Sequence, residues 1–496
     1  MKPVLSKKKS RFLDNSAIKK KIITKNKLMD NAGKLSAQFF LEKIKNPFNV
    51  KVLVLAGKGD NGGDAIIMHH YLLAYGVNSE LYMFNKSYPE SLINQYKISN
   101  KNIVNTIEDV NQYDWFVDGI FGIGLNREIK EPYKKIINLI KNKNVISLDI
   151  PSGIDCDSGL PISDSYVGAN YVLCMGTYKN ASIVNEGKKT FKNTYILDIG
   201  LPFPDKTETF LVDKGLIKNI IKKDNPLRNK YDQSCSVIVG SEKYSGAGLL
   251  SLLAALNTGA GYIKNIIPRK LLDIYSLILE SINFPIGKKA YLSISDYDDI
   301  IQSDIIYKKS PILIGPGMGD KKSTVKLISK LLQYLSNKDN SLVLDASGFT
   351  PIYEGYKISS LPKKCILTPH LGEFSKIFPN VNINNPIKAC MEVKDKLDSR
   401  VLILKGASSI IISSKRDCYI LNNGNSLLAS AGSGDALSGI ILGFLSKGYN
   451  IDHASILAVY TQGLISQIYS NSVSSSSMPP SKMIEKIPTA LNDLFS

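Results

Sequence analysis

The 496-residue sequence has no run of 18 consecutive apolar residues, so it lacks a segment that could span a membrane as a helix. The first residues, MKPVLSKKKSRF, are basic, but no apolar stretch follows them, and we therefore expect no secretory signal. No two of the six cysteines form a CxxC pair, and none of the four histidines lies in an HExxH motif. Zinc and redox sites thus have no local motif, and scattered cysteines in a long chain predict a cytoplasmic protein.

Acidic residues are outnumbered, because 44 Asp and Glu stand against 62 Lys and Arg, which gives a net charge of +18. Such a charge first suggests nucleic acid. Ten of the basic residues lie within the first 27, the others are scattered, and RNP-type, zinc-finger and basic heptad motifs are lacking. We therefore expect solvated surface charge and no specific nucleic-acid binding. The basic N-terminal stretch can equally form one face of a first helix.

The length allows two to four domains at about 100–200 residues each. Short apolar runs alternate with helix-length amphipathic segments, which predicts parallel sheets with crossover helices. The pattern breaks at residues 201–206 (LPFPDK) and again in the polar stretch 222–233, which contains Asn225-Pro226. We predict an α/β protein of two doubly wound domains, residues 1–215 and 216–496.

The predicted strands and helices follow from these runs. In the first domain the strands are Lys51–Ala56, Glu80–Phe84, Trp115–Asp118, Val145–Ile150, Tyr171–Met175 and Tyr195–Ile199, and the helices are Ala65–Tyr75 and Glu131–Asn142. In the second domain the strands are Ser236–Gly240, Pro311–Ile314, Ser341–Asp345, Cys365–Thr368, Val401–Lys405 and a hairpin of Ser409–Ser413 with Cys418–Asn422. The helices of the second domain are Gly246–Thr258, Asp435–Ser446 and His453–Tyr469.

A glycine-rich loop, Gly57–Asp64 (GKGDNGGD), follows the first predicted strand and precedes a helix. It matches GxGxxG, and Glu80 lies about 20 residues further on, as a ribose-binding acid does in dinucleotide-binding oxidoreductases. It is not a Walker A loop, since no Gly-Lys-Ser/Thr closes it. Its Asn and Asp oxygens instead suit a hard cation or a polar substrate.

Two further loops decide between these interpretations. Residues 118–128 (DGIFGIGLNRE) and 149–155 (DIPSGID) each follow a strand. Since the carboxyl ends of parallel strands share one edge of a sheet, all three loops are expected to meet there. Asp118 or Asp149 alone could simply cap a turn, but three converging polar loops make that explanation insufficient.

The three loops resemble the NAD(P)H-hydrate epimerase domain, which carries GxGNNGGDG, DALFGTGLxR and DIPSG loops, and residues 28–33 (LMDNAG) resemble its LMENAG. The resemblance covers about residues 11–215. It implies that Asp149 acts as acid and base, and that potassium is held by Asn61, Asp118 and Ser152. It implies that the hydrated dinucleotide is bound by Asp60, Asn61, Gly62, Gly63, Asp64, Gly122, Ile123, Gly124, Leu125, Asn126, Arg127 and Glu128. Asp60 and Ala65 depart from the Asn and Gly of the family loop, and Asp30 from its Glu.

The second domain has a glycine-rich turn opening a long helix, residues 430–439 (SAGSGDALSG). Such a turn offers backbone N–H groups to an anion, and Asp435 at its end can take a proton from a hydroxyl that attacks a terminal phosphate. The alternative is an acidic residue that only stabilises the helix dipole. Three more strand-end loops accompany it, namely residues 315–319 (GPGMG), 368–373 (TPHLGE) and 405–409 (KGASS).

Together these loops resemble the ADP/ATP-dependent NAD(P)H-hydrate dehydratases of the ribokinase-like fold, with their GPGLG, TPHPGE, KGxxT and GGTGDxLSG motifs. The resemblance covers about residues 229–495. It implies that Asp435 activates the substrate hydroxyl, that Ala247, Gly319 and His370 contact the hydrate, and that magnesium accompanies ADP or ATP. It implies that the nucleotide is bound by Lys405, Gly406, Ala407, Ser408, Ser409, Gly432, Ser433 and Gly434.

This half departs further from its family. Leu371 stands for Pro, Ser433 for Thr, residues 345–349 (DASGF) for DADAL and residues 425–428 (NSLL) for NPGM. Ala431 stands for Gly, and its methyl group would intrude on the phosphate loop if the position needs a positive φ.

The sequence thus predicts a bifunctional enzyme, an isomerase and a lyase, that repairs hydrated NADH and NADPH and works as a homo-oligomer. Two alternatives remain open. One is a ribokinase-like small-molecule kinase with a regulatory N-terminal domain, and the other is a non-catalytic nucleotide-binding protein.

Overall fold

The computed structural model describes residues 1–84, 90–191, 193–204, 207–222, 227, 229–238, 240–302, 309–474 and 476–495. Asp205, Lys206 and Asn225–Pro226, from the predicted breaks, and Val239, from a predicted strand, lie outside these residues. The chain forms two compact units, Lys2–Thr207 and Glu208–Ser496, with Met1 grouped with the second. Among the described residues, no helix has both the length and the apolar character that crossing a bilayer requires.

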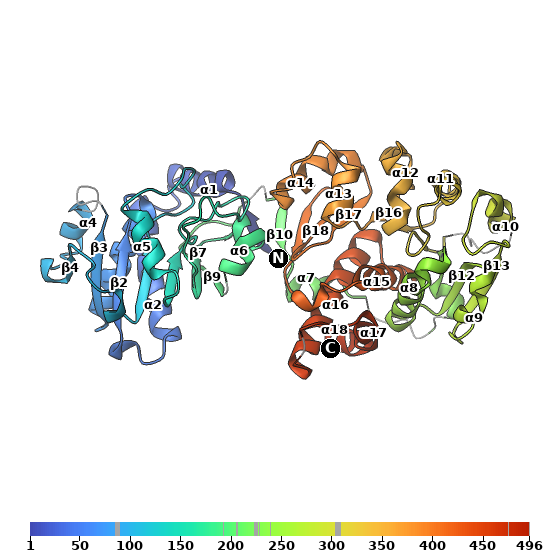
Figure 1. The fold of residues 1–496 in the computed structure, drawn as a ribbon. Coiled ribbons are helices and arrows are strands. Elements are labelled where there is room, and N and C mark those ends of the chain that lie inside the picture. The colour runs from blue at the N-terminus through green and yellow to red at the C-terminus, as the bar shows by residue number, and fades with distance from the viewer. Residues whose placement is uncertain are drawn as a thin grey trace. The chain divides into compact units, whose positions relative to one another are not determined.

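The first unit, blue to green in Figure 1, is built on a parallel sheet of order β4-β3-β2-β5-β6-β7-β9. Its strands are β2 (Lys51–Ala56), β3 (Asn78–Met83), β4 (Ile103–Val104), β5 (Trp115–Gly119), β6 (Val145–Leu148), β7 (Tyr171–Met175) and β9 (Thr194–Leu197). A separate parallel pair joins β1 (Lys2–Leu5) to β8 (Tyr178–Lys179). The helices are α1 (Lys7–Lys19), α2 (Lys25–Lys43), α3 (Asp60–Ala74), α4 (Glu90–Gln95), α5 (Tyr133–Ile140) and α6 (Asn185–Thr190).

Both faces of this sheet are covered by helices, as the apolar run of β2 requires. Alternate β2 residues point to opposite faces, so Val52 and Val54 pack with Phe40 of α2, while Leu53 and Leu55 pack with Ile137 of α5. A strand buried on both faces has no polar side to expose, which is why KVLVLA lacks alternation.

The second unit carries a sheet of order β13-β12-β11-β14-β15-β16-β17-β18-β19-β10. Its strands are β10 (Thr209–Leu211), β11 (Ser234–Ile238), β12 (Tyr262–Pro268), β13 (Ser281–Ile286), β14 (Ile312–Ile314), β15 (Leu342–Leu344), β16 (Cys365–Leu367), β17 (Val401–Leu404), β18 (Ser409–Ile412) and β19 (Cys418–Leu421). The pairings are parallel except in β17-β18-β19, which form the predicted antiparallel hairpin and its neighbour.

The helices of the second unit are α7 (Lys214–Ile220), α8 (Ser245–Thr258), α9 (Leu272–Tyr275), α10 (Tyr297–Gln302), α11 (Lys322–Ser336), α12 (Thr350–Tyr353), α13 (Leu371–Ile377), α14 (Pro386–Val393), α15 (Ser433–Ser446), α16 (Ile451–Ser472), α17 (Pro480–Glu485) and α18 (Ile487–Phe495). Helices α8, α15 and α16 bury their apolar faces against the central strands. The sequence predicts a boundary near residue 215. The two units divide slightly earlier, between Thr207 and Glu208, because β10 pairs with β19 and so belongs to the second unit.

One local prediction is wrong. The sequence predicts a loop over all of Gly57–Asp64, whereas α3 already begins at Asp60. Glycines suggest a loop, yet two of them serve close packing here: a Cβ on Gly62 would lie 2.0 Å from the carbonyl oxygen of Gly57, and one on Gly63 would lie 2.6 Å from Met29 Sδ.

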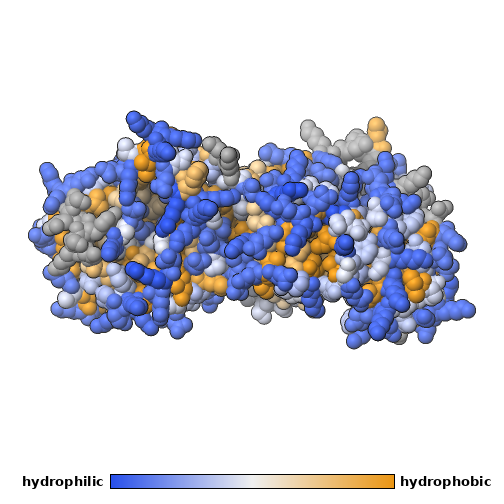
Figure 2. All heavy atoms as spheres, turned by 90° about the horizontal axis from the view of Figure 1, so that it is seen from above, coloured by the Kyte–Doolittle hydropathy of each residue, from blue (hydrophilic) through white to orange (hydrophobic). Residues whose placement is uncertain are grey.

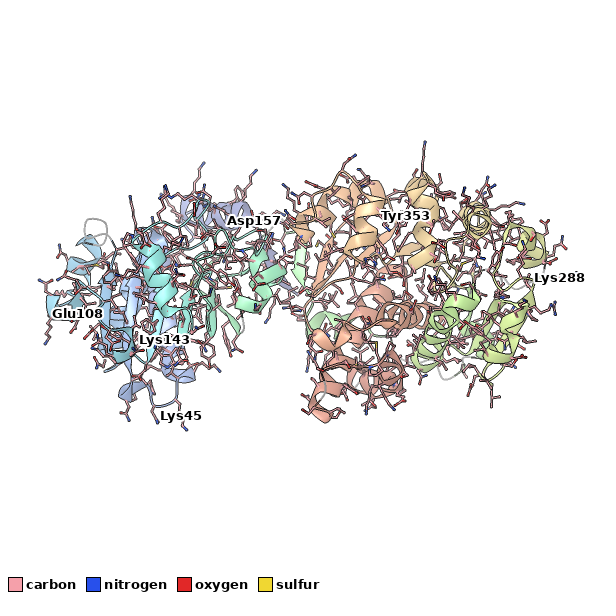
Figure 3. The ribbon with its side chains drawn as sticks, viewed as in Figure 1. Lys45, Glu108, Lys143, Asp157, Lys288 and Tyr353 are labelled. Carbon is pink, nitrogen blue, oxygen red and sulfur yellow. The ribbon has the colours of Figure 1, made fainter. Side chains whose placement is uncertain are left out.

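The basic surplus lies mainly on the surface. Figure 2 shows hydrophilic residues spread over the visible face rather than gathered in one patch, and the exposed Lys45 and Lys288 lie at the edges of their units in Figure 3. Helix α1 carries many of the basic residues of the N-terminal stretch, and it lines the cavity described below.

Candidate functional site

The first unit holds a cavity of about 960 Å³ at the carboxyl ends of its strands. Of the residues predicted to bind the dinucleotide, those on its wall are Asp60, Asn61, Asp64, Gly122, Ile123, Gly124, Leu125, Asn126, Arg127 and Glu128. Asp149 also lies on the wall, so the three loops converge as the sheet geometry predicts. Gly62, Gly63, Asp118 and Ser152 lie behind this wall rather than on it.

Asp149 follows β6 in the left-handed backbone region, with φ of 61°. Its Oδ1 lies 2.9 Å from Lys179 Nζ and accepts a hydrogen bond from Met175 N at 3.2 Å. Lys179 is only 3% exposed, and its ammonium also donates to the carbonyl oxygens of Met175 and Thr177. Burial by itself would lower the pKa of Lys179, but the Asp149 carboxylate raises it above its usual range. The lysine therefore stays charged and fixes the Asp149 side chain.

Asp118 is fully buried at the end of β5, behind the cavity wall. Its carboxylate accepts hydrogen bonds from Ser147 Oγ at 2.8 Å, Ser152 N at 2.8 Å, Ser152 Oγ at 2.6 Å and Ile120 N at 3.2 Å. Burial raises the pKa of Asp118, while these donors oppose that shift. The residue thus ties the ends of β5 and β6 together.

Asn61, in the first turn of α3, is buried, yet its side-chain oxygen and nitrogen find no hydrogen-bond partner among the described residues. Its amide group lies near Gly122, where an added Cβ would sit 3.3 Å from Asn61 Cγ. Buried polar atoms are normally satisfied, so the amide of Asn61 at this cavity wall can take a further polar partner or a cation.

Two other predicted features have different outcomes. Glu80, the acid that would bind ribose in a dinucleotide oxidoreductase, is held by Lys51 at 2.9 Å and Tyr113 at 2.5 Å and does not line the cavity. A Cβ on Gly57 would lie 1.8 Å from the carbonyl oxygen of Ile120, so this glycine serves the packing of two loops. The GxGxxG pattern therefore serves close packing at Gly57 and Gly62 and lines the cavity at Gly59, while the acid expected of an oxidoreductase lies away from the cavity.

In the second unit, Asp435 lies in the first turn of α15 and directly follows Gly434. Gly432 precedes the first residue of this helix and has a φ of 90°. Gly434 faces Lys405, since an added Cβ would lie 3.1 Å from its Nζ. Ala431 does not have a positive φ, so its methyl group introduces no backbone strain at the turn.

A lysine and a second aspartate stand beside Asp435. Lys405 Nζ forms a 2.8 Å ion pair with Asp345, which also accepts a hydrogen bond from Ser438 Oγ at 2.5 Å. Burial, and then the negative charges of Asp345 and Glu373, raise the pKa of Asp435 to about 6, while Lys405 opposes them. Asp435 can therefore accept a proton near neutral pH.

His370 lies beside this group, whereas Gly319 lies on a loop and Ala247 in α8. His370 pairs with Lys405 in an isolated parallel bridge, so the TPHLGE and KGASS loops are adjacent. Its Nδ1 accepts hydrogen bonds from Gly372 N and Glu373 N and so caps α13, and its Nε2 lies 3.6 Å from Glu373 Oε2. Gly319 lies near Ser241, and Ala247 near Gly317.

The comparisons with known proteins agree with both halves. One family model, described as YjeF-related protein N-terminus, matches residues 25–181, and another, described as NAD(P)H-hydrate dehydratase, matches residues 235–489. A bifunctional NAD(P)H-hydrate repair enzyme of Dictyoglomus turgidum is 32% identical over 490 residues, which are 94% of this chain and 94% of the relative. One from Thermofilum pendens is 27% identical over 98% of this chain and 95% of the relative.

The chain belongs to the bifunctional NAD(P)H-hydrate repair enzymes. The predicted family, enzyme class and α/β fold are thereby confirmed. A ribokinase-like superfamily protein from Enterococcus faecalis, 22% identical with a TM-score of 0.51, covers 58% of this chain and 96% of its own, which shows the fold.

Some residues of this repair-enzyme site were missed from the sequence. Lys179 follows β7 in a segment without a glycine motif, and Arg11 and Asp14 belong to α1, where only the net charge drew attention. In the second unit, the sequence predicts Asp345 only as the end of a strand and assigns it no role in the site. A lysine or aspartate at the carboxyl end of a predicted parallel strand is the signal that could have found Lys179 and Asp345.

Proposed function

We propose that this chain repairs hydrated NADH and NADPH in two steps. The first unit interconverts the R and S hydrates, and the second dehydrates the S form at the expense of ADP or ATP. Family membership supports this, and one observation carries it for the first unit. The Asp149–Lys179 pair, at 2.9 Å, stands in a cavity walled by the loops that the family uses for its substrate.

The proposed chemistry of the first unit begins with Asp149. Water adds to a dihydronicotinamide at the carbon beside the ring nitrogen, and inverting that carbon requires breaking and remaking one of its bonds. Both steps need a proton carrier within reach of the hydroxyl group. Asp149 has that position on the cavity wall, and Lys179 keeps its side chain in one orientation.

We also propose that the first unit binds a potassium ion. Asn61, Asp118 and Ser152 would hold it, and the unpartnered amide of Asn61 supports that assignment. Oxygen ligands suit a hard cation, and such an ion would supply fixed positive charge for a dinucleotide with two phosphates. Ser152 Oγ already donates its proton to Asp118, so a lone pair of Oγ can face the ion.

For the second unit, we assign proton acceptance to Asp435. The substrate hydroxyl would lose its proton to Asp435, and its oxygen would take the terminal phosphate of the nucleotide. Phosphate is a far better leaving group than hydroxide, so elimination then restores the ring double bond. Gly432–Gly434 at the N-terminus of α15 and Lys405 support phosphate binding, and magnesium would neutralise the nucleotide's charge.

Several assignments of the sequence stay predictions at this point: the remaining binding residues, the homo-oligomer and the cytoplasmic location. The six cysteines are all buried, and no disulfide joins them among the described residues, which is compatible with a reducing compartment.

The deciding experiment supplies the purified protein with separated R or S hydrates and ADP, and follows the return of dihydronicotinamide absorbance in the near ultraviolet. We expect rapid recovery from the S hydrate and accelerated recovery from the R hydrate. No recovery from the S hydrate contradicts the dehydratase, and a stable phosphorylated product identifies a kinase instead. Recovery from S without acceleration from R contradicts the epimerase.

A further inference from the structure

Helix α1 forms one wall of the cavity in the first unit, although no motif marks it. Arg11, Asp14, Asn15 and Ile18 all line that cavity. The most basic stretch of the sequence therefore lies directly on the proposed epimerase site.

Contacts at the start of α1 hold it against the substrate loop. Lys7 Nζ donates to the carbonyl oxygens of Gly124 and Leu125, each at 3.2 Å. Lys7 N donates to Asp157, labelled in Figure 3, at 2.7 Å. Ser6 Oγ accepts from Lys9 N and so caps the helix. The position of Asp14, two turns further along, is thus set by the same loop that lines the cavity.

Inversion of a carbon that bears a hydroxyl group needs proton delivery as well as proton removal. The C–O bond breaks as the oxygen takes a proton and leaves as water, while the lone pair of the ring nitrogen forms a C=N bond. A water then adds to the other face, its C–O bond forms, and its proton goes to a base. One proton enters and one leaves, so two carriers serve the reaction best.

Asp149 is suited to accept a proton, since Lys179 and Met175 N both engage it as a carboxylate. We propose that Asp14 is the second catalytic residue of the epimerase site, the one that delivers a proton to the departing hydroxyl group. This inference rests on the proposed function of the first unit. Asp14 comes from another element than Asp149 and shares its cavity.

The electrostatics agree with this division of roles. Burial raises the pKa of Asp14 to about 6, the Asp149 and Asp60 carboxylates act in the same direction, and Lys179 opposes them. The charged groups that line the cavity from its facing elements are Lys25, Lys58, Asp60, Asp64, Arg127, Glu128, Lys130, Glu131, Asp149 and Lys179, and Arg11 comes from α1 itself. Two carboxyl groups in different environments are the usual arrangement for an acid and a base in one site.

The test uses the full-length protein with ADP and compares Asp14→Asn with Asp164→Asn, an exposed control in the same unit that does not line the cavity. Asp14→Asn is expected to slow enzymatic recovery from the R hydrate by about 10²–10⁴-fold, mainly in kcat, and to leave recovery from the S hydrate unchanged. Asp14→Glu is expected to restore part of the rate. The wild-type pH profile of R-to-S interconversion, measured by chromatography without ADP so that Asp435 of the second unit does not contribute, is expected to show an inflection near pH 6 that Asp14→Asn lacks.

The results separate the two hypotheses. If the wild type does not accelerate recovery from the R hydrate, the proposed epimerase fails. If it does, and Asp14→Asn stays within threefold of it, or changes only KM, or keeps the inflection, the role of Asp14 is refuted while the epimerase stands. Should Asp14→Asn fail to fold, as fluorescence of the only tryptophan, Trp115 in β5, would report, Asp14→Ser is judged by the same criteria.

Discussion

The two proposed sites use the same pair of groups, an aspartate and a lysine, in opposite ways. In the first unit the lysine bonds directly to the proposed catalytic carboxylate, Asp149 to Lys179 at 2.9 Å. In the second unit Lys405 bonds instead to Asp345 at 2.8 Å, and the pKa of Asp435 rises to about 6 through burial and the neighbouring Asp345 charge. The ion pair with Lys179 fixes the Asp149 side chain in place. Because Lys405 pairs with Asp345 instead, Asp435 forms no ion pair of this kind with a described residue, and its raised pKa lets it exchange a proton near neutral pH.

The largest effect is expected from removing each carboxylate in turn. Asp149→Asn should reduce recovery from the R hydrate by about 10³-fold or more and spare the S hydrate, because it removes a proton carrier from one unit only. Asp435→Asn should abolish recovery from both hydrates while epimerisation continues, since dehydration is the last step. Chromatography of the two epimers without ADP measures that epimerisation. Loss of both activities in either folded variant would contradict two separate sites.

The second-largest effect is expected on the stability of the first unit, when the buried Lys179 is replaced. Lys179→Met leaves Asp149 partly buried without its cation, and the free energy of unfolding of this unit is expected to fall by about 3–5 kcal/mol. Trp115 lies in the first unit and is the single tryptophan of the chain, so its fluorescence during urea unfolding reports this unit alone. The exposed Lys45→Met is the matched control and should leave the midpoint unchanged.

Asp435→Asn should also stabilise the second unit above pH 6. The folded pKa of Asp435 lies above its value in the unfolded chain, so the folded state binds its proton more tightly, and stability falls as pH rises from about 4 to 6. Asparagine removes that penalty. Calorimetry at pH 8 should show the melting temperature of the second unit raised by a few degrees, with the Trp115 transition unmoved. An unchanged or lower melting temperature would show that burying the ionised Asp435 carboxylate does not destabilise the second unit.

The smallest effect should come from Asp345→Asn. This change removes a negative charge that raises the pKa of Asp435 and releases Lys405, which lowers it. The ascending limb of the dehydratase pH profile should then move by about one unit toward lower pH. Because Lys405 is proposed to bind nucleotide, KM for ADP is measured at each pH to separate binding from proton transfer. An unchanged pH profile would mean that the ion pair between Lys405 and Asp345 does not set the pKa of Asp435.

Much of this arrangement follows from local sequence. The run KVLVLA, followed by a glycine-rich loop, predicts β2 at its observed bounds, and the loops after β2, β5 and β6 do meet at one cavity. The start of α3 is not predictable in the same way, because Gly62 and Gly63 suggest a loop by composition. Their role is close packing against Gly57 and Met29, which depends on the fold of the turn and on a residue distant in the chain.

The sequence by itself determined the family, the two α/β halves and the loops that carry Asp149 and Asp435, because glycine spacing and strand-end carboxylates are local patterns. Only the tertiary structure decided which lysine meets which aspartate, that the amide of Asn61 is left unpartnered, and that α1 lies over the cavity. These facts depend on side chains 30 to 150 residues apart. A pattern of neighbouring letters does not encode the distance between such side chains, whereas burial and charge, which set their chemistry, depend on it.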